Sequence, residues 1–441
     1  MMGRVKKMAK VTALSAVVLG GLFATADQVS AKELKTQPSS YETVIEVKDW
    51  GATVTKIIVD LGRPVPQGSV TTDTFSVNVS RSDSRLEPSL LGAGIVNVTN
   101  AYVADKDGNP AVQTGKYVVL EMEYGPTLAL SSALNYQVAT GRNDWTTNAY
   151  TITQQTAIET PAGSVSGLVV TEFAGTTKEI IEDFETGAST FEDVTLTYAD
   201  YSPAQDNQEN PLIIWLHGGG EGGTDATIPL AANKATALAT DEIQSYFDGA
   251  YVLAPQTPTY WMDGIGGRAD GSSKYEDALM ALIEEYVANN PDVDTDRIYI
   301  GGPSNGGYMT MLMVRDYPGY FAAAFPVCEG LNDVLISDAD IQNLAQTPIW
   351  FTAAANDMVL PPAINTIPTY NRLLAAGADV YMTLFDNVED TSGLYTNADG
   401  TPYQYNGHFS WVYVHNNEVS TVIDGPEITL MQWLSEQSLN D

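Results

Sequence analysis

The chain has 441 residues, of which 44% are hydrophobic and 17% charged, a composition typical of a globular protein that excludes general disorder. Its formal net charge of −34 argues against nucleic acid or an anionic membrane surface as a partner. A single cysteine, Cys328, excludes an intrachain disulfide, and three histidines exclude a His-rich metal site. Because Cys328 lies in an apolar segment, we expect it to be a buried structural thiol, and we expect no metal and no cofactor.

The first 31 residues have the pattern of a secretory signal. Basic residues at positions 4–10 precede an uncharged stretch, 11–24, and Val29-Ser30-Ala31 fits a small-x-small cleavage site. The uncharged stretch is too short to span a bilayer comfortably. The sequence therefore predicts a signal peptide over residues 1–31, a linker over 32–40 and a secreted, extracellular protein with no integral membrane segment after cleavage. An uncleaved N-terminal anchor is the alternative interpretation.

Residues 41–182 show an all-β pattern. Turn signals at residues 61–64 and 105–110 separate short runs that alternate or are β-branched. Strands are expected at 43–47, 54–59, 75–79, 117–123 and 150–153. Strands of this length and number predict a β-sandwich of immunoglobulin type. Asp105, Asp107 and Asn109 are spaced like the start of a calcium loop, but its glycine and closing glutamate are missing, so we expect a hairpin turn.

Residues 184–441 alternate between strand and helix patterns, which predicts a doubly wound α/β domain with a mostly parallel sheet. The continuous apolar run at 211–216 is typical of a strand buried on both faces. Further strands are expected at 192–198, 251–254, 297–301, 321–327, 348–355 and 380–385. Helices are expected at 273–289, 308–314 and 366–376, and Pro426 is expected to open a last one. The spacing of Ser273 and Glu276 predicts a capping box at the start of the first of these helices.

A G-x-S-x-G match, Gly302-Pro303-Ser304-Asn305-Gly306, joins an expected strand to an expected helix. In α/β-hydrolases this pentapeptide is the nucleophile elbow, which exposes the serine at a strained turn. Glycines flank the serine because a Cβ would clash where neighbouring chain segments pass close by. The helix behind the serine places its positive end where an oxyanion would form. The strand before and the helix after set this match apart from an ordinary turn, so we predict Ser304 as the nucleophile.

A serine hydroxyl needs a base to take its proton, and the usual base is a histidine held by a carboxylate. In α/β-hydrolases these residues follow the chain order Ser, acid, His. His408 ends a long loop, 386–407, of the kind that serves sites, and we predict it as the base. The alternative is His415, which we expect at the surface end of an apolar segment.

The predicted acid is Asp357, because it directly follows the expected strand 348–355. Asp333, after the preceding strand, is the second candidate, and Asp386 is the third.

An oxyanion hole needs two backbone N–H groups. Asn305, directly after the nucleophile, should supply one of them. The glycine-rich loop 217–223 should supply the other from Gly219 or Gly220, between which the sequence does not choose. His217 is then expected to anchor the loop. Phosphate binding is another use of such loops, but no Gly-Lys-Ser/Thr follows, which excludes a P-loop.

Four segments together resemble secreted bacterial α/β-hydrolase esterases of the polyhydroxybutyrate-depolymerase and feruloyl-esterase type, which are often described as prolyl-oligopeptidase-like. They are Leu216-His217-Gly218-Gly219-Gly220-Glu221-Gly222-Gly223-Thr224-Asp225, Ala254-Pro255-Gln256, Gly302-Pro303-Ser304-Asn305-Gly306-Gly307-Tyr308-Met309 and Gly407-His408-Phe409-Ser410-Trp411. The resemblance covers about residues 184–441, and some members carry an N-terminal immunoglobulin-like domain. It implies Ser304, Asp357 and His408 as the triad. The chain departs from relatives at Pro303, which should stiffen the turn.

The sequence thus predicts a secreted serine carboxylesterase that acts on a small-molecule or polymer ester, with short acyl chains favoured. Trp261, Tyr308 and Trp411, together with Tyr260, are predicted to line its pocket. One alternative is a prolyl-oligopeptidase-type peptidase, although the repeats of a β-propeller are absent from the sequence. The other is a non-catalytic surface-binding protein in which the sandwich is the functional part.

Overall fold

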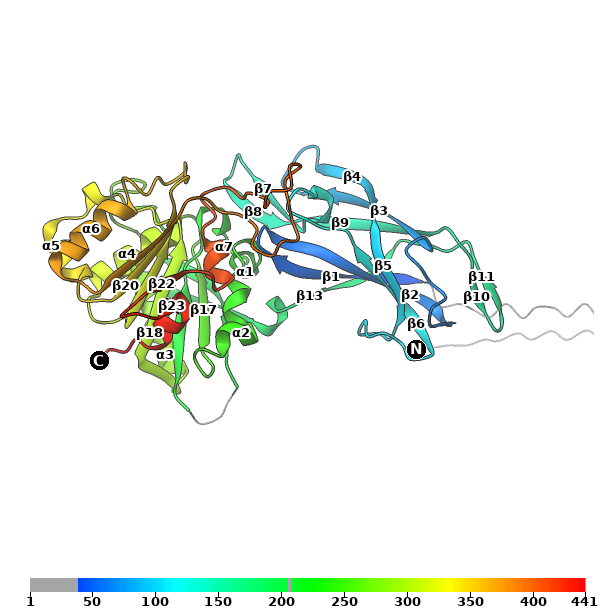
Figure 1. Cartoon of the computed structure of the whole chain (residues 1–441), viewed down its shortest axis with the longest axis horizontal. Coiled ribbons are helices and arrows are strands. Elements are labelled where there is room, and N and C mark those ends of the chain that lie inside the picture. The colour runs from blue at the N-terminus through cyan, green and yellow to red at the C-terminus, as the bar shows by residue number, and fades with distance from the viewer. Residues whose placement is uncertain (1–38, 205–207, 441) are drawn as a thin grey trace, which may run out of the picture. The chain divides into compact units, whose positions relative to one another are not determined.

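The computed structural model describes residues 39–204 and 208–440 (Figure 1). The predicted signal peptide, residues 1–31, and positions 32–38 of the predicted linker lie outside the described residues. Within the described ranges no helix is both long and apolar enough to cross a bilayer.

The N-terminal part is a β-sandwich of immunoglobulin type, as predicted (Figure 1). Side chains alternate along its strands, so that Phe75, Val77 and Val79 of one strand are buried while their neighbours face outward. One sheet has the order β13 (Glu172–Lys178), β1 (Ser40–Lys48), β2 (Gly51–Pro66), β6 (Thr114–Met122) and β5 (Val98–Ala104). The other has the order β12 (Val169–Val170), β9 (Thr147–Gln154), β3 (Phe75–Ser82) and β4 (Leu90–Val96). Two small hairpins extend from it, β7 (Leu134–Gln137) with β8 (Arg142–Trp145), and β10 (Ile158–Thr160) with β11 (Gly163–Val165).

One of the two predicted turns in this region is wrong. Residues 61–64 lie inside β2, where the register with β6 shifts between Asp60 and Val65 and Gly62 has a φ of 69°. A Gly-Pro turn signal can therefore also mark an irregularity within a long strand. The turn at 105–110 is confirmed, because Asp105 Oδ1 accepts hydrogen bonds from the N–H groups of Asp107 and Asn109 at 2.9 Å each.

The C-terminal part is built on an eight-stranded sheet, as predicted for an α/β-hydrolase (Figure 1). Its order is β14 (Glu185–Phe191), β15 (Val194–Tyr201), β17 (Tyr251–Gln256), β16 (Asn210–Trp215), β18 (Val293–Pro303), β19 (Ala323–Val327), β20 (Ile349–Ala354) and β21 (Val380–Phe385). The six strands from β17 to β21 in this order are parallel to one another. Strand β15 is antiparallel to both of its neighbours, β14 and β17. The carboxyl ends of the parallel strands therefore meet at one edge, where ligands bind in such sheets.

Both faces of this sheet are buried, as the apolar run in β16 predicts. Leu212 and Ile214 belong to one apolar cluster, whereas Ile213 and Trp215 belong to another. The first cluster includes residues of α3 (Glu276–Asn289), α4 (Asn305–Asp316), α5 (Asp338–Leu344) and α6 (Thr366–Ala376). The second includes residues of α1 (Thr227–Ala232), α2 (Asp241–Gln244), α7 (Trp411–His415) and α8 (Leu430–Ser435), and it continues into the core of the sandwich. The two parts of the chain thus share one apolar core.

Three local predictions in this part need correction. The capping box is wrong: α3 begins at Glu276, and the Ser273 hydroxyl instead accepts from Tyr275 N–H at 3.2 Å. Pro426 opens no helix, because Asp424 and Gly425 adopt positive φ and turn a hairpin between β22 (Ser420–Val422) and β23 (Glu427–Thr429). The strand expected at 192–198 begins only at Val194, after a turn with Glu192 at a φ of 52°.

Candidate active site

Ser304 lies at the sharp turn between β18 and α4, with φ 56° and ψ −113°. This conformation is disfavoured for a residue with a side chain and costs on the order of 1–3 kcal/mol. The flanking glycines permit it, since a Cβ on Gly302 or Gly306 would lie 2.1 or 1.9 Å from the carbonyl oxygen of Leu216. The turn is held by a 2.8 Å hydrogen bond from Ser304 N–H to the Val327 carbonyl. The local sequence thus places a half-buried serine hydroxyl at the carboxyl edge of the sheet.

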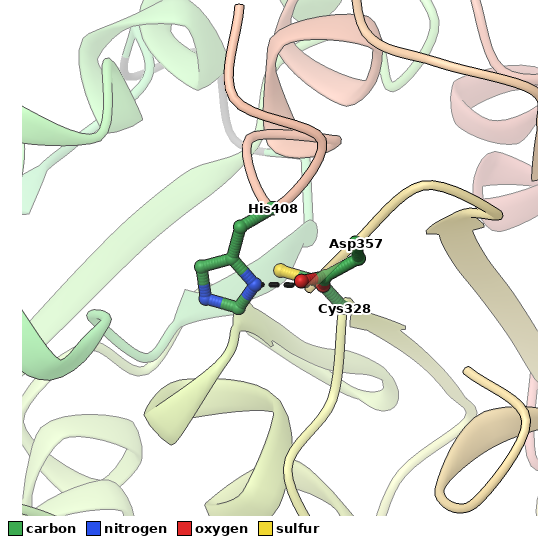
Figure 2. A group of neighbouring side chains, drawn as sticks. All are labelled: Cys328, Asp357 and His408. Atoms are coloured by element: carbon green, nitrogen blue, oxygen red, sulfur yellow. Dashed lines mark hydrogen bonds and ion pairs between the residues drawn. The ribbon is translucent and has the colours of Figure 1, made fainter. Parts of the chain in front are cut away.

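Asp357 and His408 form a buried hydrogen-bonded pair (Figure 2). Asp357 follows β20, and its Oδ1 accepts from the N–H groups of Val359 and Leu360 at 2.8 and 3.0 Å. Its Oδ2 lies 2.7 Å from Nδ1 of His408. Because Nδ1 is engaged with the carboxylate, Nε2 is the ring nitrogen left for proton transfer.

Cys328 lies beside this pair, as Figure 2 shows. It is buried, as predicted, and its Sγ, a carboxylate oxygen of Asp357 and a ring nitrogen of His408 lie within 4.8 Å of one another. Burial by itself lowers the pKa of His408, but Cys328 and Asp357 favour the charged ring and raise this pKa above its ordinary value. These three side chains could ligate a soft metal ion, although two of them are already bonded to each other.

The other two histidines have the opposite electrostatic environment. His217 is buried, with Nδ1 2.6 Å from the Gly218 carbonyl and Nε2 accepting from Thr257 N–H at 3.1 Å. Burial lowers the pKa of His217 to about 4, so it stays neutral and ties its loop to the segment after β17.

His415 is fully buried in α7, which corrects the expected surface position. Its ring lies 4.5 Å from that of Trp215, and neither of its nitrogens has a hydrogen-bond partner among the described residues. Burial lowers its pKa to about 3. His415 therefore packs as a neutral ring between α7 and Trp215 of β16.

The glycine-rich loop after β16 is held by buried polar contacts. Gly218 N–H donates to Asn233 Oδ1 at 3.3 Å, and the Glu221 carbonyl accepts from Gln256 Nε2 at 2.8 Å. The Glu221 side chain is buried and accepts from Asn143 Nδ2, of the N-terminal sandwich, at 3.0 Å. Burial raises the pKa of Glu221 to about 7, while the hydrogen bond from Asn143 opposes that rise.

A cavity of about 710 Å³ brings these segments together. Of the sequence-predicted residues, its lining includes Ser304, His408, Gly219, Gly220 and Trp411, as well as Tyr260. Asp357 and Asn305 lie buried behind this surface.

Trp261 and Tyr308 are not part of the cavity lining. Trp261 is fully buried between His217 and Tyr275, with ring-centroid distances of 5.2 and 6.3 Å. The Tyr308 hydroxyl is bonded to the backbone of Gly271 and Ser272, at 2.9 Å each. Both side chains instead stabilise the segment that follows β17.

The alternative acids lie in other environments. Asp333 accepts from Arg372 at 2.9 Å and from Thr369 at 3.1 Å, and Asp386 is exposed at the end of β21. Neither Asp333 nor Asp386 is bonded to His408.

The N-terminal sandwich supplies one wall of the cavity, which sequence reasoning missed. Asp49 and Trp50 lie between β1 and β2, and the remaining residues come from the β7–β8 hairpin and the segment before it: Ser132, Leu134, Tyr136, Gly141 and Asn143. The sequence carries no local signal for these residues, because it does not reveal which sandwich loops face the second domain.

Comparisons with known proteins agree with this architecture. Residues 40–167 match the esterase Ig-like N-terminal domain, and residues 260–378, which contain Ser304 and Asp357, match the prolyl oligopeptidase family. None of the curated proteins matches the chain.

Among solved structures, a thermostable esterase is 24% identical over 90% of this chain and 99% of its own, with a TM-score of 0.73. A ferulic acid esterase is 13% identical over 46% of this chain and 89% of its own, with a TM-score of 0.38. An acylaminoacyl peptidase of Pyrococcus horikoshii is 16% identical over 67% of this chain and 49% of its own, with a TM-score of 0.35. Of these three, the thermostable esterase alone exceeds a TM-score of 0.5, and at 24% identity this likeness shows the fold alone. The chain therefore combines an esterase-type immunoglobulin-like domain with an α/β-hydrolase domain that carries a prolyl oligopeptidase family segment, and the comparisons support a carboxylic ester hydrolase.

Proposed function

We propose that this protein is a secreted serine carboxylesterase with Ser304, His408 and Asp357 as its triad. The observation that carries the proposal is that Ser304, at its strained turn, and His408, bonded to the buried Asp357, line the same cavity. A strained backbone conformation costs stability, and such conformations cluster at functional sites. Secretion rests on the sequence pattern of residues 1–31 and is tested by N-terminal sequencing of exported protein.

Acylation begins when His408 Nε2 takes the proton of the Ser304 hydroxyl and Oγ attacks the ester carbonyl. A tetrahedral oxyanion forms, and the imidazolium is stabilised by the Asp357 carboxylate at 2.7 Å. His408 then returns the proton to the leaving alkoxide, so that the alcohol departs and the acyl group stays on Ser304. Water attacks the acyl-enzyme by the same route, which releases the carboxylic acid and restores the serine.

The oxyanion is expected to receive hydrogen bonds from the N–H groups of Asn305 and Gly219. Asn305 is the first residue of α4, where backbone N–H groups have no partner within the helix. In the loop after β16, the Gly218 N–H donates to Asn233, and Gly220 packs against the sandwich, where a Cβ on it would lie 3.0 Å from Asn143 Nδ2. The Gly219 N–H has no acceptor within residues 39–204 and 208–440, which leaves it for the substrate. A Cβ on Gly219 would lie 4.0 Å from that of Asn305, so the two donors come from adjacent segments.

The cavity volume of about 710 Å³ is within the usual range for small-ligand sites. Aromatic side chains from both domains line it: Trp50, Tyr136, Tyr260, Phe409 and Trp411. We expect an ester of a short acyl group with a larger alcohol part, free or at the end of a polymer.

The test is hydrolysis of p-nitrophenyl esters from acetate to palmitate by the full chain and by Ser304→Ala. Turnover of the C2–C4 esters that the substitution abolishes is the expected result. A folded wild-type protein that hydrolyses none of the series would contradict the esterase proposal.

A peptidase is the second candidate, because residues 260–378 match the prolyl oligopeptidase family. Cleavage of blocked peptide p-nitroanilides at a kcat/KM above that for the best ester would favour it. No peptide cleavage beside rapid ester turnover is the outcome expected here.

A further inference from the structure

The β7–β8 hairpin of the sandwich contacts the catalytic domain directly behind the glycine-rich loop. Arg142 Nη2 donates to the Pro258 carbonyl at 2.6 Å, and Trp145 Nε1 donates to Thr227 Oγ1 at 2.9 Å. Between these two residues, Asn143 Nδ2 donates to Glu221 Oε1 at 3.0 Å. A Cβ on Gly220 would lie 3.0 Å from Asn143 Nδ2, so the amide also touches the loop backbone itself.

Glu221 is the only acceptor that links this hairpin to the loop carrying Gly219 within the described residues. Glu221 is 3% exposed, and a Cβ on Gly218 would lie 2.9 Å from its Oε2, so the carboxyl group packs against the loop next to Gly219. A carboxyl group buried in this way is costly unless its oxygens are hydrogen-bonded. Loss of Asn143 would therefore leave an oxygen of Glu221 unpaired and free the carboxyl group to move away from the loop.

We propose that Asn143 and Glu221 form a positioning pair, through which the sandwich holds the Gly219 N–H in the direction of the oxyanion. Both side chains line the cavity, but neither is hydrogen-bonded to Ser304 or His408 among the described residues, so we assign the pair an action through the loop. The proposal deepens the esterase function proposed above and rests on it. Because oxyanion donors act mainly in the transition state, a misplaced Gly219 should lower kcat far more than it raises KM.

The experiment compares Asn143→Ala, Asn143→Asp, Glu221→Ala and the double variant Asn143→Ala/Glu221→Ala in the full chain. Asn143→Asp keeps the size of the side chain but sets one carboxyl group against another, so it separates the hydrogen bond from packing. We expect Asn143→Ala to lower kcat on p-nitrophenyl butyrate about 10- to 100-fold with KM within about threefold, somewhat less than the loss of an oxyanion donor itself. Asn143→Asp should lose at least as much, and the double variant no more than about the larger single loss, because the two residues act together.

Thr227→Val is the matched control. It removes another hydrogen bond between the same hairpin and the catalytic domain, that of Trp145, together with the bond from the Thr227 hydroxyl to Asp225 Oδ1, but no hydrogen bond to residues 217–223. We expect its kcat to stay within about twofold of the wild type. An equal fall of kcat in Thr227→Val and Asn143→Ala would overturn the proposal, because the hairpin would then matter only by docking. A kcat of Asn143→Ala within twofold of the wild type would also overturn it.

Two further readouts separate this proposal from the esterase function. The rate at which diisopropyl fluorophosphate modifies Ser304, followed by intact mass, also depends on the oxyanion donors and needs no ester substrate. Amide hydrogen exchange of residues 216–224 reports the loop alone and should speed up in Asn143→Ala but not in Thr227→Val. If no ester is hydrolysed, the esterase proposal fails, whereas the positioning pair stands or falls on these two rates.

Discussion

The two walls of the cavity differ in how the chain encodes them. The catalytic wall comes from segments that follow strands β16, β17, β18, β20 and β21, whose carboxyl ends the parallel topology brings to one edge of the sheet. The opposite wall comes from a turn and a hairpin of the sandwich, and its residues reach the cavity only because the two domains share a core. This difference indicates that the chemistry is local in sequence, whereas the shape of the cavity depends on tertiary packing.

The strongest test of the catalytic wall is Ser304→Ala. We expect kcat to fall by at least about 10⁴-fold, because the nucleophile and base act as a unit. The melting temperature should remain within a few degrees of the wild type, since alanine has the same Cβ at the strained position. Retention of more than a hundredth of the activity would remove Ser304 from its proposed role.

Asp357→Asn should have the next largest effect, a loss of about 10⁴-fold in kcat. Asp357 helps to raise the pKa of His408, and only the neutral ring can accept a proton. The acidic limb of kcat/KM should therefore move to lower pH in the variant. Asp333→Asn is the control, since its partner is Arg372 and not His408, and its activity should stay within about threefold.

The sequence could predict most of the catalytic wall because each part has a local signature. Ser304 lies between flanking glycines, Asp357 directly follows a strand, and His408 ends a long loop. The sequence could not place His415, Trp261 or Tyr308, because an apolar or aromatic segment looks the same whether it faces a cavity or a neighbouring strand.

The same limit applies to the sandwich. Its strands follow from alternation, and the Gly-Pro signal at residues 61–64 shows that a turn pattern can lie inside a strand. Trp50 and Asn143 could not be recognised, since their roles depend on contacts with residues about 80 or more positions away.

Trp50→Ala tests whether the sandwich wall shapes specificity. The Trp50 ring lines the cavity and meets Tyr395 edge to face at 4.9 Å. Its removal should raise KM for an octanoate ester roughly 5- to 10-fold by loss of apolar contact, with little change for acetate. Tyr124→Ala is the control, since its ring lies 6.5 Å from that of Trp50 and it is not part of the cavity lining. Equal changes for both esters would show that this wall does not select the acyl group.

The smallest effect is expected from Glu329→Gln, which lies entirely on the catalytic side. Glu329 is buried beside the turn after β19, accepts from Leu331 N–H at 2.6 Å, and has its pKa raised by burial to about 8. In the unfolded chain the carboxyl group ionises near its ordinary pKa of about 4.5, whereas in the folded protein it stays protonated until about pH 8. Its contribution to stability is thus present below about pH 4.5 and is lost as the pH rises towards 8. The variant cannot ionise, so its melting temperature should exceed that of the wild type by a few degrees at pH 9 and match it near pH 4.5. A difference that does not change between these pH values would mean that Glu329 is already ionised in the folded protein, and that burial on this side of the molecule is less complete than its contacts indicate.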